Sequence, residues 1–322
     1  MVSSSAVNTT PPHLQRGGDP LCGSSSMRFA DVQEQACALT GWNQDYLQLT
    51  AGSYRGEIRQ IQGSGIKVFV ECVEQSVLQT GTLPRGVLAV GIPLDSSGTA
   101  LFCGKPCTAD SFHVFSGSSG FEFRTSRQHT MLGIELQLGC EWLSHALPGQ
   151  ADVVHLPVPV LQELKAYLLA FFKSALAAPE LLSNPAVLVT VGDFLLDRMT
   201  QGRLDGVRGE DAASHWKLVQ QACDRVNAQI DQAPSIARLC LDLGVSRRTL
   251  QNGFQQVLDI SPLAYLKAVR LGHARRALKQ VGSVTEAATA YGFWHFGHFS
   301  HDYQAMFGER PSQTLRRHSL IC

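Results

Sequence analysis

The carboxyl-terminal third of this 322-residue chain contains one helical pattern twice. In SIARLCLDLGVSRRTLQNGFQQV an amphipathic helix is expected to end at Leu243, a turn follows at Gly244, and Ser246 is placed to cap a second helix. SVTEAATAYGFWHFGHFSHDYQAMF repeats the plan, with small residues such as Ala287 for close helix packing and Gly292 at the turn. Both stretches therefore predict helix-turn-helix units. The segment SPLAYLKAVRLGHARRALKQ between them predicts one connecting helix that holds the units at a fixed separation.

The second helix of the first unit has two chemically different sides. At about 100° per residue, the predicted core stripe consists of Leu250, Phe254, Val257 and Leu258. The opposite side carries Arg248, Thr249, Asn252, Gln255 and Gln256, with Gln251 on the flank. Arginine can bridge guanine O6 and N7, and asparagine or glutamine can pair with adenine, so this side suits contacts with base edges. The alternative is a solvated polar face without a ligand.

Three histidines, at positions 295, 298 and 301, mark the second unit. Six residues of helix rise about 9 Å, whereas zinc–nitrogen bonds are about 2 Å long, so His295 and His301 cannot share one zinc ion. The predicted core is Phe299, Tyr303, Met306 and Phe307, and Gly297, His301 and Gln304 lie opposite. We expect His298 and Trp294 to flank this outward face and His295 to lie at the edge of the core. No metal site is predicted, and His301 is expected to contact bases or phosphate.

The zero net charge of the chain hides an asymmetry. Residues 215–322 contain 13 Lys and Arg against 7 Asp and Glu, and residues 1–214 contain 14 against 20. A basic carboxyl-terminal third joined to an acidic remainder predicts a polyanionic partner. Further basic residues near the two units are Arg247, Arg270, Arg275, Arg276, Lys279, Arg316 and Arg317. We expect some of them to contact phosphates and others to lie in solvent.

Roughly the last hundred residues contain the segments ARLCLDLGVSRRTLQNGF, SPLAYLKAVRLGHARRAL, AATAYGFWHFGHFSHDYQAMFG and the closing ERPSQTL. Through these segments this part of the chain resembles the AraC/XylS transcriptional regulators. The resemblance implies two recognition helices that enter successive major-groove segments of promoter DNA. It points to Arg248, Gln251 and Asn252 as base-facing residues, and Arg247 and Gln255 complete the first predicted contact set. In the second unit it points to Phe296, Gly297, Ser300 and His301. Family members commonly place hydrogen-bonding side chains at the first two of these positions, whereas this sequence has an aromatic ring and a glycine there. For the second unit we therefore expect phosphate contacts, apolar contacts and recognition of DNA shape.

The amino-terminal part predicts a different architecture. Short β-prone runs such as GIKVFVECV, GVLAVGIPL, SFHVFSG, FEFRTS and TMLGIELQL alternate with turns between Tyr46 and Leu138. A helical period follows, with Leu161, Leu164, Leu168 and Phe172 on one face and a second helix near residues 186–199. These helices could form a subunit interface or cover their own domain. We predict an α+β multidomain fold: a cupin-like β sandwich or barrel with helices, then an all-α tandem helix-turn-helix domain.

The expected boundaries follow from composition. Residues 1–28, rich in Ser, Thr, Pro and Gly, predict a disordered tail, and residues 29–200 a sensing or dimerisation domain. Residues 201–214 predict a linker, and residues 215–322 the DNA-binding domain. The nine cysteines have no framework spacing; Cys103 and Cys107 in CGKPC are expected to be free thiols on a turn rather than a metal or redox motif. His113 and His129 stand apart and are expected to be ordinary surface or core histidines.

The predicted function is a sequence-specific DNA-binding transcription regulator, more in keeping with an activator, in the cytoplasm and without a membrane segment. The resemblance implies RNA polymerase as a partner, a homodimer, and a small-molecule or protein effector at the amino-terminal domain. Within the family the last helices look like the subgroup of ethanolamine-operon and quorum-sensing or virulence regulators. No cofactor and no enzyme activity are expected. The alternatives are a ligand-sensing protein that acts through protein partners, and a cupin-type enzyme.

Overall fold

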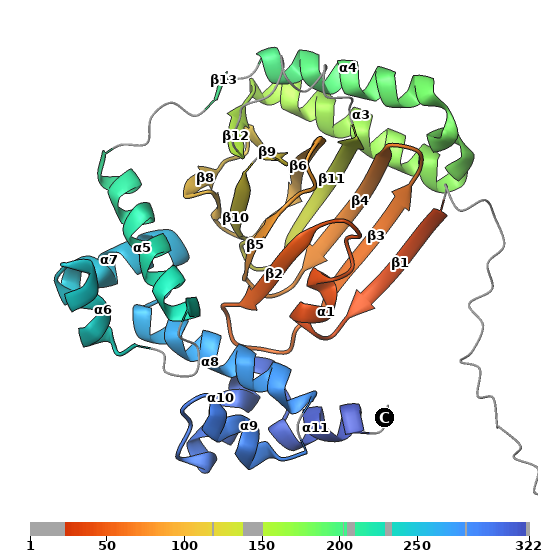
Figure 1. Ribbon diagram of the computed structural model, residues 1–322. Helices are drawn as coiled ribbons and strands as arrows, with labels where there is room; N and C mark the ends of the chain where they lie inside the picture. Colours follow the sequence, from red (N-terminus) through yellow and green to blue (C-terminus); the bar gives the residue numbers. More distant parts are fainter. Residues whose placement is uncertain are drawn as a thin grey trace, which may run out of the picture.

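The computed structural model describes residues 23–117, 119–137, 151–201, 203–204, 210–228, 234–280 and 282–319. Two antiparallel sheets form the amino-terminal part, and helices form the carboxyl-terminal part (Figure 1). This confirms the predicted two-part α+β fold, while the likeness to a cupin stays a prediction. None of the helices in these ranges has the length and apolarity that a bilayer crossing requires.

The larger sheet has eight strands in the order β1-β3-β4-β11-β6-β9-β12-β13. Its strands are β1 (Gly23–Phe29), β3 (Gly56–Gln62), β4 (Ile66–Val73), β11 (His129–Gln137), β6 (Val87–Asp95), β9 (Ser111–Ser116), β12 (Asp152–His155) and β13 (Arg203–Leu204). The smaller sheet has the order β2-β5-β10-β7-β8. Its strands are β2 (Asn43–Gln48), β5 (Val77–Thr82), β10 (Gly120–Arg124), β7 (Ala100–Phe102) and β8 (Lys105–Cys107). The five β-prone runs thus become β4, β6, β9, β10 and β11.

Burial on both faces explains why the central strands β4 and β6 of the larger sheet are mostly apolar on both sides. Alternate residues of β4 show this: Val68 and Val70 belong to a core with the helices, and Phe69 belongs to a core between the sheets. The second core also contains Phe102 and Phe123 of the smaller sheet. The pleat therefore sends neighbouring side chains into two different cores.

Helices α3 (Val158–Ala177) and α4 (Pro185–Gln201), joined by the 3-10 turn η1 (Pro179–Ser183), lie over the outer face of the larger sheet (Figure 1). The predicted stripe of Leu161, Leu164, Leu168 and Phe172 is buried in the core with that sheet. These helices therefore cover their own domain. Their outer surface still exposes Tyr167, Leu176 and Val189, and a role in dimerisation stays a prediction.

The tail and linker boundaries differ from expectation at two points. The expected disordered tail extends to residue 28, but β1 begins at Gly23 and pairs with β3 along its whole length, Gly23 opposite Gln62 and Phe29 opposite Gly56. Residues 1–22 lie outside the described ranges. In the expected linker, α4 extends to Gln201 and α5 (Glu210–Ala228) begins before residue 215. Of the six residues that precede Phe29 in β1, all but Met27 are polar or small. The sequence therefore lacks the apolar pattern of a strand here, because this edge strand is largely exposed.

The carboxyl-terminal helices form two groups joined by one long helix (Figure 1). They are α6 (Ile236–Leu243), α7 (Arg247–Leu258), α8 (Pro262–Leu278), α9 (Val284–Ala290), α10 (Phe296–Phe307) and α11 (Pro311–Ser319). The first group packs around Leu250 and Phe254 with α5 and α6, and the second around Phe299 and Tyr303 with α9 and α8. Helix α8 contributes to both cores, Tyr265 to the first and Leu271 to the second. It therefore connects two separately packed units.

Candidate nucleic-acid interface

Local chemistry explains the turn of the first unit. Gly244 ends α6 with φ 65°, a left-handed conformation that glycine adopts without strain. The Ser246 hydroxyl then accepts a hydrogen bond from the Thr249 amide at 3.0 Å and caps α7. The predicted core residues Leu250, Phe254, Val257 and Leu258 are all buried. The helix-turn-helix unit and its core stripe are thus formed as predicted.

Helix α7 presents its polar side outward. The predicted contact residues Arg247, Arg248, Gln251, Asn252 and Gln255 are all exposed. Gln255 Nε2 donates to Asp259 Oδ1 at 2.8 Å, so this amide already has a partner within the chain. Arg247 and Arg248 lie in the first turn, where the helix dipole adds positive potential. The outer side of α7 thus combines cations and amides on a rigid support, which suits an anionic duplex.

The second unit begins its outer helix later than the sequence suggested. Ser283 caps α9, Gly292 has φ 78° at the turn, and α10 begins only at Phe296. His295 was expected at the edge of the core, but it is the residue before the helix and is exposed. The helical projection fails for His295 because its φ and ψ are extended. Trp294 also precedes α10 and is 74% exposed.

The predicted contacts of α10 lie on or near its outer side. Phe296 is 42% exposed, Gly297 is exposed with open space around it, Ser300 is half-buried, and the His301 side chain is 82% exposed. Phe299, Tyr303, Met306 and Phe307 are buried as predicted. No group of three or more potential metal ligands occurs within the described ranges. The face therefore offers rings, one imidazole and backbone rather than a row of amides.

The basic residues near the units divide into separate environments. Arg316 and Arg317 on α11 are exposed, although Arg317 Nη2 lies 2.5 Å from Glu309 Oε2. Arg275 differs from the expectation that these cations meet phosphate or solvent. It is 5% exposed, and its Nε donates to Asp31 Oδ2 at 2.6 Å. This arginine is bound inside the protein and is unavailable to a ligand at the outer surface.

His113 and His129 are core residues of the sandwich. His113 is fully buried and stacks on Phe102, with ring centres 4.8 Å apart, and His129 packs against Phe123 at 5.3 Å. Burial lowers the pKa of His113 to about 3 and that of His129 to about 4, so both are neutral at pH 7. None of the described cysteines forms a disulfide, and Cys107 Sγ lies 3.0 Å from His113 Nε2. Cys103 lies at the turn between β7 and β8, with φ 48°.

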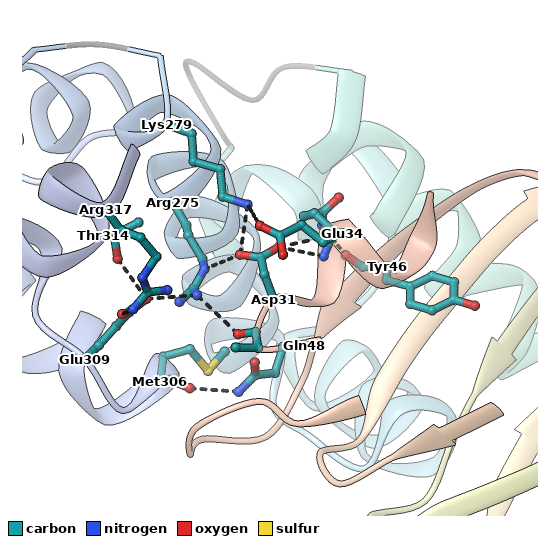
Figure 2. Close-up of polar contacts among 12 residues, drawn as sticks. Asp31, Glu34, Tyr46, Gln48, Arg275, Lys279, Met306, Glu309, Thr314 and Arg317 are labelled. Carbon is teal, nitrogen blue, oxygen red and sulfur yellow. Dashed lines mark hydrogen bonds and ion pairs between the residues drawn. The ribbon is translucent and has the colours of Figure 1, made fainter. Parts of the chain in front are cut away.

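Sequence reasoning missed a set of polar contacts between the two parts of the chain. Asp31 and Gln48 of the amino-terminal part meet Arg275 and the end of α10 (Figure 2). The Gly52 amide also donates to Met306 O at the end of α10. No local pattern marks these residues, because the hydrogen-bonded partners are 244 to 258 positions apart in the sequence. The charge asymmetry of the sequence predicts a polyanionic partner, and it does not identify these contacts.

The carboxyl-terminal helices are similar to a domain of known proteins. Residues 239–317 match a family model described as a helix-turn-helix domain. The chain is 38% identical over 103 residues to a probable thc operon regulatory protein of Rhodococcus erythropolis, covering 31% of each chain. It is 35% identical over 99 residues to a XylDLEGF operon transcriptional activator of Pseudomonas putida, covering 30% of each. The matches thus span about a third of the length of these relatives.

A solved structure is also similar to part of this chain. It is an AraC-type transcriptional regulator from Chromobacterium violaceum, with 30% sequence identity and a TM-score of 0.31. The likeness covers 33% of this chain and 96% of that one.

Proposed function

We propose that this chain, in which residues 239–317 match a helix-turn-helix domain, is a sequence-specific DNA-binding transcription regulator of the AraC/XylS type. One observation carries the proposal: two separately packed helix-turn-helix units share a connecting helix, and each exposes an outer helix. Helix α8 has 17 residues and is about 25 Å long, which suits a connector between readers of successive major grooves about 34 Å apart.

In this proposal α7 is the first reader and α10 is the second reader, and the two have different tasks. Arg248, Gln251 and Asn252 of α7 read base edges, because their side chains supply the hydrogen bonds that distinguish guanine and adenine in the major groove. Phe296, Gly297, Ser300 and His301 of α10 contribute apolar, backbone and phosphate contacts, which position the protein more than they specify sequence. Arg247 in the first turn of α7 and Gln255 in its last turn complete the DNA contacts of the first reader.

The remaining parts of the proposal concern partners. One relative bears the name of an operon regulatory protein and another that of an operon transcriptional activator, which supports activation of transcription. In this proposal RNA polymerase at a promoter is the partner and the cytoplasm is the location. A homodimer would double the DNA site and raise affinity through effective concentration. The amino-terminal sandwich is the part of the chain available to sense a small molecule or a protein.

Selection from a pool of duplexes with a randomised central region tests the function. The full chain should enrich one sequence family at low ionic strength, because base-edge contacts of the first reader favour particular bases. The matched control is the double variant Arg248→Ala/Asn252→Ala, whose changes lie at exposed positions and leave the helical core intact. This variant should enrich no sequence although it folds. Enrichment of nothing by the wild-type chain would overturn the proposed function.

A further inference from the structure

One buried cation joins the amino-terminal domain to the second reader (Figure 2). The Arg275 side chain on α8 is 6% exposed; its Nε lies 2.6 Å from Asp31 Oδ2, and its Nη2 lies 2.9 Å from Glu309 Oε1. The guanidinium carbon also lies 4.5 Å from the centre of the Phe307 ring, at the end of α10. A buried arginine is costly unless its donors are satisfied by well-placed acceptors. Here the acceptors come from both sides of the domain boundary.

The amino-terminal domain also satisfies the end of α10 directly. Met306 O accepts hydrogen bonds from Gln48 Nε2 at 2.7 Å and from the Gly52 amide at 3.1 Å. Carbonyl groups in the last turn of a helix lack partners within the helix, so these donors supply what α10 cannot. Gly308 follows with φ 72°, and a Cβ there would lie 1.9 Å from Ser53 Oγ. A side chain at position 308 would therefore clash with Ser53.

Asp31 is itself anchored in the sandwich. Its carboxylate accepts from the Gln33 and Glu34 amides and caps α1 (Val32–Ala36). One turn later, Gln35 Nε2 donates at 2.9 Å to Glu71 Oε1, which is buried on β4. Burial alone would raise the pKa of Asp31, but Arg275 and Lys279 hold it below its usual value. Asp31 is thus a charged, fixed partner of Arg275 at neutral pH.

We propose that Arg275 is a positioning residue of the second reader, and that the amino-terminal domain, through Asp31, sets the direction in which α10 meets DNA. The inference rests on the proposed function. The first reader is supported differently: its core includes Leu49 and Leu78 of the amino-terminal domain as apolar neighbours. Loss of the Asp31 charge therefore affects the second DNA segment and spares the first.

The test uses the full chain and a duplex that it selects from the randomised pool. Hydroxyl-radical footprinting should show two protected segments for the wild-type chain, and the segment weakened by Arg248→Ala identifies the first reader. Asp31→Asn removes the charge and keeps a good helix cap for α1. This variant should lose protection of the second segment, retain the first, and bind about tenfold more weakly, as is typical of coupling between sites.

A matched control uses the ion pair of Arg276, the residue after Arg275 on α8, with Asp45 of β2. Asp45→Asn removes the same charge from the pair with Arg276, whose Nη2 lies 2.5 Å from Asp45 Oδ1. Because these side chains are 34% and 57% exposed, affinity should change less than about twofold and both segments should stay protected. Equal loss of both segments in Asp31→Asn, or a footprint indistinguishable from that of Asp45→Asn, overturns the proposal.

A second variant approaches Arg275 from the reader. Glu309→Gln keeps the shape of the side chain and removes its charge, without changing the amino-terminal domain. If Arg275 positions α10, this variant should also lose the second segment selectively, even if Asp31→Asn does not fold. Unchanged protection of the second segment in Glu309→Gln would overturn the proposal. A wild-type chain that selects no duplex would overturn both this inference and the proposed function, whereas two protected segments that both variants retain would overturn the inference alone.

Discussion

The Ser246 hydroxyl accepts the Thr249 amide at 3.0 Å and so closes the first turn of α7, the helix that carries Arg247 and Arg248. Ser246→Ala should remove this cap and lower the free energy of unfolding by about 1 kcal/mol. Urea unfolding followed by circular dichroism measures the loss. Ser246→Asn, which also caps well, should remain close to wild type. A Ser246→Ala protein as stable as wild type would show that the cap contributes nothing.

Arg248 is expected to read a base rather than to bind phosphate. Arg248→Ala should lose about 1–3 kcal/mol on the selected duplex and much less on random DNA. Titration of both duplexes under one salt condition measures the difference. Equal loss on the two duplexes would assign Arg248 to phosphate contact.

His301 is expected to matter less for specificity than Arg248, because the second reader offers few side-chain hydrogen bonds to bases. His301→Ala should change the ratio of affinities for selected and random duplex by less than Arg248→Ala does. The same titrations provide the ratio. A larger loss of specificity for His301→Ala would show that the two readers have the opposite ranking.

Arg247, exposed in the first turn of α7, is expected to meet a phosphate. Arg247→Ala should weaken binding on all sequences and reduce the slope of log affinity against log salt by about 1. The control is Arg55→Ala in the amino-terminal domain, whose side chain is 78% exposed and which should leave the slope unchanged. An unchanged slope for Arg247→Ala would exclude a phosphate contact.

Buried neutral histidines should make the sandwich sensitive to acid. Both His113 and His129 have a folded-state pKa, about 3 and about 4, below the 6.5 of an unfolded histidine. Between pH 6.5 and about 4 the unfolded chain therefore binds protons that the folded chain does not, so stability falls as pH falls. Each histidine should cost roughly 1–2 kcal/mol between pH 7 and pH 5.

Urea unfolding at pH 7 and pH 5 tests this expectation. His129→Gln should reduce the loss of stability at pH 5, because the glutamine does not titrate. The exposed His298→Gln serves as control and should retain the full loss. The same pH dependence in His129→Gln and wild type would contradict the role of His129.

Local patterns predicted much of the fold. The core stripes of α7 and α10, the caps and the β-prone runs follow from periodicities of a few residues, and the structure confirms Leu250, Phe254, Phe299 and Tyr303 as core. The exposure of Arg248 and Asn252 followed from the same geometry. His295 was misplaced, because the helix begins one residue after it and the projection does not extend into a turn.

The sequence by itself determined the two helix-turn-helix units, since caps, glycine turns and apolar stripes are encoded within each unit. Only the tertiary structure decided where Arg275 belongs: composition placed it among surface cations, and folding placed it between Asp31 and Glu309. It likewise brought His113 and His129 into one aromatic core around Phe123. The physical reason is that a buried charge or ring is stable only where distant segments supply its partners, and their arrival depends on how the whole chain packs.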